Sequence, residues 1–137
     1  MLFESNSFPT DWYGYLTNQL GHIVVGVFLV FVVNRAGFEL LGEYPHRLHV
    51  WWLVTIFYVL VVEVRMQGWR GFDTVEDSVF TCCYGAGAPL WAFSEVSAGS
   101  PIVSGDIAAL DVFFLIASLH LAVGVGYRAY RAIKIGS

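Results

Sequence analysis

Four long apolar stretches restrict the fold of this chain of 137 residues more than any other feature. Each stretch approaches the roughly 20 residues that an α-helix needs to cross a bilayer. The first stretch is the clearest, and the next charged residue after it is Arg35. The stretches lie at about residues 12–34, 49–66, 72–94 and 107–127. We therefore predict an all-α fold: a single domain over residues 1–137 that is a polytopic bundle of four transmembrane helices.

The composition favours a membrane protein over a soluble one. Apolar residues make up 57% of the chain and charged residues only 13%, whereas a soluble domain carries about 25% charged residues. A water-soluble core of this size would not bury so many large apolar side chains. The expected partners are membrane lipids and either other membrane subunits or further copies of the chain. The net charge of −4 argues against binding of nucleic acid.

The third stretch differs from the others because it begins with acidic residues and continues through Gly85, Gly87 and Pro89. Small residues permit close approach of helix backbones, so we place this stretch inside the bundle. The connection at residues 36–48 mixes polar and apolar residues and is expected to form a short amphipathic helix at the interface. Residues 97–105 are expected to form a loop, since Gly, Ser and Pro are frequent there.

The distribution of Lys and Arg predicts the orientation in the membrane, because basic residues are more frequent in cytoplasmic connections. With four spans, the two termini and the turn at 64–71 lie on one side. That side carries five basic residues against two on the other, and the five are Arg65, Arg70, Arg128, Arg131 and Lys134. The chain is therefore predicted to lie in the cell inner membrane with both termini in the cytoplasm.

Carboxylates and an imidazole lie in or beside the apolar stretches, where charge is costly and usually marks a functional site. Asp73 and Asp77 are four residues apart and share one face of a helix. His22 and Gly26 have the same spacing on the first stretch. If these two faces pack together, the imidazole comes close to the carboxylates, while Glu63 ends the second stretch on the same side. The pattern predicts a cytoplasm-facing polar site formed by His22, Glu63, Asp73 and Asp77.

Each of these residues also has a simpler interpretation. Acidic residues in the first turn of a helix, such as Asp73 and Glu76, can cap free N–H groups and complement the helix dipole. On that interpretation both face cytoplasmic water. Glu63 can form an interfacial ion pair with Arg65 or Arg70, and His22 can be a hydrogen-bonding residue between packed helices.

Several short motifs together resemble a known family. They are Gly21-His22, the acidic Glu63, the run Gln67-Gly68-Trp69-Arg70, and the run from Asp73 to Asp77 before Gly85 and Gly87. In this order they resemble the VanZ-like membrane proteins and their YjdF-like relatives over about residues 18–90. The Asn that is usual in the third span of the VanZ pattern is absent, with Thr81 or Cys82 in its region. The last span has no counterpart in the pattern.

VanZ-like proteins are associated with glycopeptide-antibiotic tolerance, and the YjdF-like branch has no settled function. Carboxylates and a histidine in a cytoplasm-facing membrane pocket can hold a divalent cation, or act as acid and base toward a lipid-linked or cell-envelope substrate. His22, Glu63, Asp73 and Asp77 would be the catalytic residues. Asp73, Asp77 and Glu63 would bind a divalent cation such as magnesium, although an imidazole ligand leaves zinc open. The residues expected to contact the substrate are Asn18, Gln67 and Arg70. The alternatives are a non-catalytic transmembrane subunit of a larger complex, a phage-type holin and a small transport component.

Overall fold

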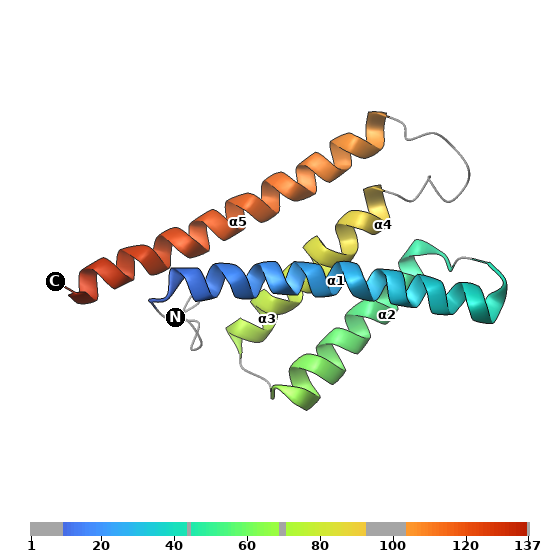
Figure 1. Cartoon of the computed structure of the whole chain (residues 1–137), viewed down its shortest axis with the longest axis horizontal. Helices are drawn as coiled ribbons and strands as arrows, with labels where there is room; N and C mark the ends of the chain where they lie inside the picture. The colour runs from blue at the N-terminus through green and yellow to red at the C-terminus, as the bar shows by residue number, and fades with distance from the viewer. Residues whose placement is uncertain (1–9, 44, 69–70, 93–103, 137) are drawn as a thin grey trace.

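The computed structural model describes residues 10–43, 45–68, 71–92 and 104–136, without the side chains of residues 92, 104–110 and 136. All regular secondary structure in these ranges is helical, which confirms the predicted fold class. The elements are α1 (Trp12–Leu41), α2 (Arg47–Phe57), η1 (Tyr58–Met66), α3 (Phe72–Ser78), η2 (Val79–Gly87), α4 (Ala88–Ala92) and α5 (Ser104–Gly136). Elements α2 and η1 form one continuous helical segment, and so do α3, η2 and α4 (Figure 1).

Three helices are long and apolar enough to cross a membrane, which supports the prediction of a membrane protein. They are Trp12–Leu41, Arg47–Met66 and Asp111–Ile135. At 1.5 Å per residue α1 is about 45 Å long, more than the roughly 30 Å of a hydrocarbon core. The third predicted span, here the segment from α3 to α4, does not belong to this group within the described residues. Its side chains are the most thoroughly buried of the bundle, in agreement with the predicted interior position.

Helix α1 extends beyond its predicted end, so the prediction of a separate amphipathic helix at residues 36–48 was wrong. Arg35 and Glu39 form an ion pair one turn apart on the helix surface, which favours its continuation. The helix ends where Gly42 adopts φ 76°, a left-handed conformation suited to glycine, and donates its N–H to the carbonyl of Phe38. The loop predicted at 97–105 lies outside the described residues up to 103, and α5 already begins at Ser104.

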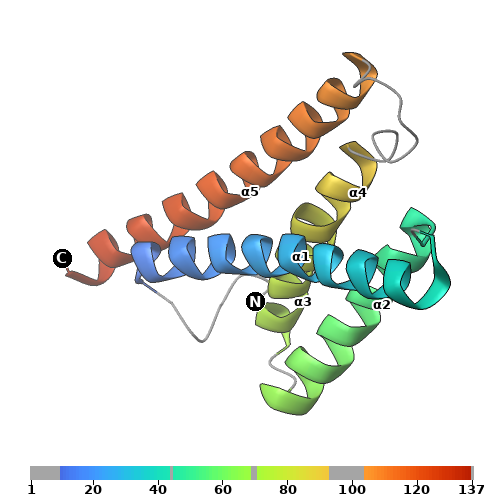
Figure 2. The ribbon, with the colours of Figure 1, turned by 45° about the vertical axis from the view of Figure 1, so that its right-hand side comes forward.

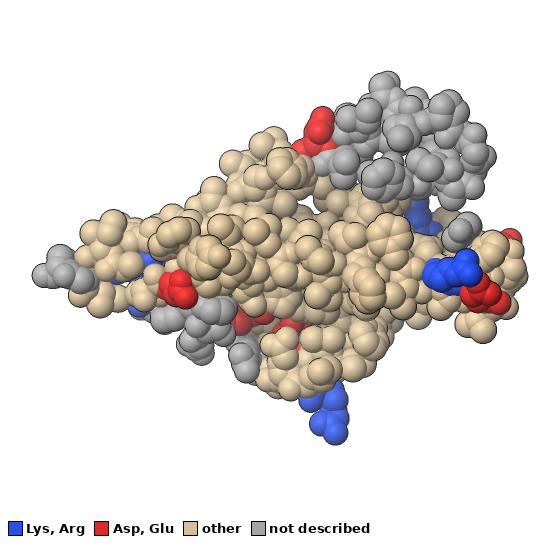
Figure 3. Space-filling model, viewed as in Figure 1, with Lys and Arg blue, Asp and Glu red and all other residues tan. Residues whose placement is uncertain are grey.

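The helices cross at open angles. In Figures 1 and 2 the end of α5 lies beside the start of α1, whereas the start of α5 lies near α4. The segment from α3 to α4 crosses α1 near the middle of the molecule in both views. Figure 3 shows that uncharged side chains cover the middle of α1, while charged ones lie toward its ends. The exposed apolar residues of α1 include Val24, Phe28 and Phe31, as expected for a surface that faces lipid.

Apolar residues fill one half of the bundle, away from the start of α1. The buried cluster consists of Val30, Val50, Val54, Ala86 and Leu90. Trp51 packs against this cluster and donates its indole N–H to the carbonyl of Cys82 at 2.9 Å. The polar side chains described below occupy the other half.

Glycines allow α1 and η2 to approach backbone to backbone. A Cβ atom added to Gly26 would overlap the carbonyl oxygen of Thr81 and would lie 2.8 Å from Gly85 Cα. A Cβ atom added to Gly85 would lie 2.9 Å from Gly26 Cα. The prediction that the Gly26 face of the first helix packs against the third segment is therefore confirmed.

Two segments of nine residues each, η1 and η2, are π-helical. Such helices are rare, usually occur as single turns, and are frequent at functional sites. Their i to i+5 pattern changes which side chains share a face, compared with an α-helix. Both segments contribute polar side chains to the same region of the bundle, opposite the first half of α1.

Candidate metal centre

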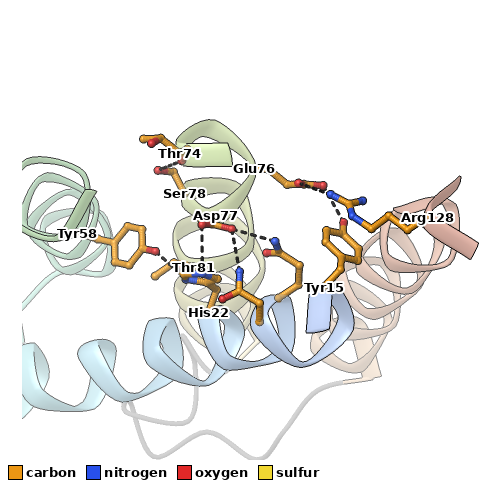
Figure 4. A network of polar contacts seen from close by, with 11 residues as sticks. Tyr15, His22, Tyr58, Thr74, Glu76, Asp77, Ser78, Thr81 and Arg128 are labelled. Atoms are coloured by element: carbon orange, nitrogen blue, oxygen red, sulfur yellow. Dashed lines mark hydrogen bonds and ion pairs between the residues drawn. The ribbon is translucent and has the colours of Figure 1, made fainter. Parts of the chain in front are cut away.

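His22 is the residue around which this region is organised. Its Nε2 atom lies 3.3 Å from Asp77 Oδ2, and its Nδ1 atom lies 2.7 Å from the hydroxyl oxygen of Tyr58. The hydroxyl of Thr81 lies 3.3 Å from the same Nδ1. Figure 4 shows Tyr58 pointing toward His22 from one helical segment, and Asp77 and Thr81 from another. Both ring nitrogens are thus engaged, which fixes the orientation of the imidazole.

Glu63 completes a group of three possible metal ligands with His22 and Asp77. One ligand atom from each residue lies within 4.8 Å of the other two. Glu63 is only 1% exposed, and its Oε1 atom has no hydrogen-bond partner among the described residues. A buried carboxylate oxygen without a partner is costly and calls for an explanation, such as an ion that the centre binds. As the group that could hold a metal ion, His22, Glu63 and Asp77 are called the metal centre below.

Amide side chains from α1 orient Asp77. Gln19 Nε2 donates to Asp77 Oδ1 at 2.9 Å, and Asn18 Nδ2 lies 3.4 Å from the same oxygen. Because both amides contact Oδ1, the other carboxylate oxygen of Asp77, Oδ2, is left to contact His22. Asn18, predicted to contact a substrate, therefore contacts Asp77 and positions it, and Gln19 was not predicted at all.

The charges of the metal centre are not balanced by a basic side chain in the part of the chain that the structure describes. The ion pairs found there join Arg35 to Glu39 and Arg128 to Glu76, and none joins Lys or Arg to Glu63 or Asp77. The carboxylate of Glu63 is buried and that of Asp77 is part-buried, and a bound proton or a cation would offset their charge beside one imidazole. The centre is therefore compatible with a cation-binding site.

The remaining predicted site residues lie apart from the metal centre or outside the described residues. Asp73 is buried in the first turn of α3, but the group of three does not include it. It precedes Asp77 by one helical turn, about 6 Å along the axis, which explains the difference. Gln67 is exposed just beyond the end of η1. Arg70 lies outside the described residues.

A second polar centre surrounds Glu76, the neighbour of Asp77 in sequence. The hydroxyl of Tyr15 donates to Glu76 Oε1 at 2.7 Å, and His120 Nε2 lies 3.6 Å from this oxygen. Arg128 Nη2 lies 3.7 Å from Glu76 Oε2, and its guanidinium carbon lies 3.5 Å from the ring centroid of Tyr15 (Figure 4). Glu76 is only 6% exposed, so the alternative interpretation, in which it faces cytoplasmic water as a helix cap, does not apply.

The imidazoles of the two centres have the same kinds of partner at the same ring nitrogens. In the second, the hydroxyl of Tyr84 lies 3.2 Å from His120 Nδ1, while Nε2 of this histidine faces Glu76. Each imidazole therefore lies between a tyrosine hydroxyl at Nδ1 and a carboxylate at Nε2. A carboxylate partner orients an imidazole, which suits a metal ligand or a general base.

Two site residues that were not predicted, Tyr15 and Gln19, do follow a regular helical spacing in the sequence. Tyr15, Gln19, His22 and Gly26 follow the spacing of one helical face, and Tyr15 and Gln19 extend the polar stripe of α1 toward its start. Tyr58 has no such signal, because it lies in a π-helix five residues before Glu63.

No protein-family model, curated protein or solved structure matches this chain.

Proposed function

We propose that the chain is an integral membrane protein that binds a divalent cation at the metal centre and acts on a lipid-linked or cell-envelope substrate, as the resemblance to VanZ-like proteins suggests. The observation that carries the proposal is the meeting of His22, Glu63 and Asp77 within 4.8 Å of one another, from three separate helical segments. Glu63 supports it further through its buried Oε1 atom, which lacks a partner among the described residues.

The chemistry follows from the contacts of His22. A bound divalent cation supplies Lewis-acid activation of water or of a phosphoryl oxygen. The imidazole contacts the Tyr58 hydroxyl through Nδ1 and faces Asp77 with Nε2, so with Nε2 and Asp77 on the cation it would hold the Tyr58 hydroxyl beside the centre, where this hydroxyl can exchange a proton with the reacting group. The amides of Gln19 and Asn18 keep Asp77 in place.

A lipid-linked substrate suits the depth of the centre. His22 lies ten residues after Trp12 in α1, which corresponds to about 15 Å along the helix. Glu63 lies three residues before the end of η1 and Asp77 five residues after the start of α3, so both lie within about two helical turns of the connection between these elements. With both termini in the cytoplasm, as the five basic residues against two suggest, the centre lies toward the cytoplasmic leaflet.

A small transport component is the second candidate, and the repeated order of contacts favours it. Two chains from tyrosine through histidine to carboxylate meet at Glu76 and Asp77, adjacent residues of α3. Chains of this kind inside membranes relay protons in pumps and transporters. Purified protein in sealed vesicles with an internal pH dye distinguishes the candidates, because only a transport component changes the internal pH when a cation or pH gradient is applied.

The proposed function predicts that Asp77→Asn and Glu63→Gln each abolish activity. Both substitutions remove a charge with little change in volume. The measurement is the tolerance of a bacterial host to a glycopeptide antibiotic when it expresses the chain. The matched control is Glu39→Gln, because Glu39 is exposed and forms an ion pair with Arg35 on the surface of α1, away from the metal centre. Membrane levels of each variant are compared by immunoblot. Tolerance that survives both substitutions would rule out a role for the centre, and no tolerance with the wild-type chain would rule out the substrate class.

The proposed orientation predicts that the C-terminus reacts only from the cytoplasmic side, whereas residue 100 reacts from the opposite side. A cysteine is introduced by Ser137→Cys or, for the opposite side, by Ser100→Cys, after Cys82 and Cys83 have been replaced by alanine. A membrane-impermeant maleimide added to intact cells should label the second variant and not the first. Labelling of the first variant from outside would show the reverse orientation.

A further inference from the structure

We infer that the metal centre takes a first-row transition dication of the zinc class in preference to magnesium, and that it leaves one coordination position open for water or substrate. This inference rests on the proposed function, since it names the cation of the same centre. It differs from the magnesium expected from the sequence, because the structure replaces Asp73 with His22 as the third ligand.

The ligand set decides the class of metal. Magnesium prefers oxygen ligands in a near-ideal octahedron and usually keeps several waters. Zinc and its neighbours accept imidazole together with carboxylate. The centre offers one imidazole nitrogen and two carboxylate groups. Its side chains leave little room for several waters, since Glu63 is fully buried and the side chains of His22 and Asp77 are each only 13% exposed.

The distances suit a tetrahedral ion. Two ligands about 2.1 Å from a tetrahedral zinc ion are about 3.4 Å apart. His22 Nε2 and Asp77 Oδ2 are 3.3 Å apart, which matches this separation. Glu63 offers a ligand atom within 4.8 Å of a ligand atom of each of the other two residues, so the three side chains must draw together by about 1.4 Å at most, within reach of a side-chain rotation.

The surrounding side chains provide the outer contacts of a metal site. A histidine that ligates a metal commonly donates its other ring N–H to a neighbouring oxygen, which fixes the tautomer. With Nε2 on the metal, Nδ1–H of His22 donates to the Tyr58 hydroxyl at 2.7 Å. Gln19 donates to Asp77 Oδ1 at 2.9 Å and leaves Oδ2 for the metal. Three protein ligands with a fourth position open are typical of catalytic zinc sites, whereas structural sites have four.

The test measures metal binding by the full chain in detergent, independently of any substrate. The protein is treated with a chelator, dialysed against zinc chloride with a large excess of magnesium chloride, and analysed by mass spectrometry for bound metal. We expect one zinc per chain. With cobalt chloride in place of zinc, we expect the visible absorption bands of four-coordinate cobalt, without the near-ultraviolet band of a thiolate ligand.

Variants locate the site. His22→Gln, Glu63→Gln and Asp77→Asn should each weaken zinc binding at least 100-fold, and Tyr58→Phe about 10-fold as an outer contact. Glu39→Gln should bind like the wild type. The double variant Cys82→Ala with Cys83→Ala should also bind, which excludes the thiols as ligands. Circular dichroism and size-exclusion chromatography show which variants are folded, and Tyr58→Phe, which keeps all three ligands, tests the site if a ligand variant is not folded.

Two results would overturn the inference: magnesium that displaces zinc at comparable concentration, and zinc binding unchanged in all three ligand variants. An absence of bound metal would also overturn it. The antibiotic-tolerance assay separates this failure from failure of the proposed function. If the chain confers tolerance that Asp77→Asn abolishes but binds no metal, the centre acts through protons. If it binds zinc but confers no tolerance, the substrate class is wrong.

Discussion

Gly26→Ala will destabilise the protein and disrupt the metal centre, although it adds only one methyl group. A Cβ at this position would overlap the carbonyl oxygen of Thr81, and the obstacle is backbone, which cannot rotate away. Overpacking a tightly packed contact costs about 1–3 kcal/mol, and we expect about 3 kcal/mol here because two helix backbones must separate. Thr81 also contacts His22, so a shift of η2 changes the surroundings of the imidazole.

Gly21→Ala is the matched control for this prediction. Gly21 lies in the same helix, and a Cβ added to it meets no atom within 4 Å. Because alanine favours helices over glycine by about 1 kcal/mol, this variant should be as stable as the wild type or slightly more stable. The free energy of unfolding in detergent and the bound zinc are measured for both variants. Equal stability of the two variants would show that α1 and η2 do not approach as closely as the structure indicates.

Arg128→Met will cost about 3–5 kcal/mol in the free energy of unfolding, because it leaves Glu76 buried without its cation. Arg128 is 4% exposed, lies against the ring of Tyr15 and donates to the carbonyl of Gly124 at 3.2 Å. These contacts join the end of α5 to the start of α1. We therefore expect α5 to separate from the bundle in this variant, which increases proteolysis within α5.

Arg131→Met is the control, since Arg131 lies one turn later in α5 and its guanidinium contacts only the ring of Tyr127 among the described residues. It should lower the free energy of unfolding by less than about 1 kcal/mol. The double variant Arg128→Met with Glu76→Gln should recover part of the lost stability, because no uncompensated charge remains buried. A loss in the double variant equal to the sum of the two single losses would show that Arg128 and Glu76 do not interact.

Much of the metal centre could be predicted from helical spacing. His22 and Gly26 lie on one face of α1, Asp77 lies on the facing side of the third segment, and the packing of Gly26 against that segment brings them together. Glu63 was predicted from the cost of placing a carboxylate at the end of an apolar helix. These predictions needed only helical periodicity and the energetics of buried charge.

Other contacts depend on structural features that helical periodicity in the sequence does not reveal. The π-helix η1 places Tyr58 and Glu63 on the same side at a spacing of five residues, which an α-helical pattern does not predict. One interpretation of Glu76 placed it at the surface, because acidic residues commonly occupy first turns. Its burial depends on Arg128, 52 residues later in the sequence, and nothing local to either residue indicates such a pair.

The end of α1 also could not be predicted from the pattern of apolar and polar residues. A change from apolar to polar residues after Arg35 suggested the end of the helix, yet the helix continues to Leu41. Polarity on a helix surface marks the edge of a membrane and not the end of the hydrogen-bonded backbone. The left-handed Gly42 was the correct signal, because the backbone conformation at that residue is what ends the helix.

A double-mutant cycle between His22 and Asp77 tests most directly whether these two side chains meet in one centre. The free energy of unfolding is measured for the wild type, His22→Gln, Asp77→Asn and the double variant, all in the presence of a chelator so that metal does not contribute. Because His22 Nε2 and Asp77 Oδ2 lie 3.3 Å apart, the two single effects should not add. We predict a coupling energy of about 1 kcal/mol or more, in the range found for residues in contact. Single effects that add to within about 0.5 kcal/mol would place the two residues apart and would contradict the metal centre.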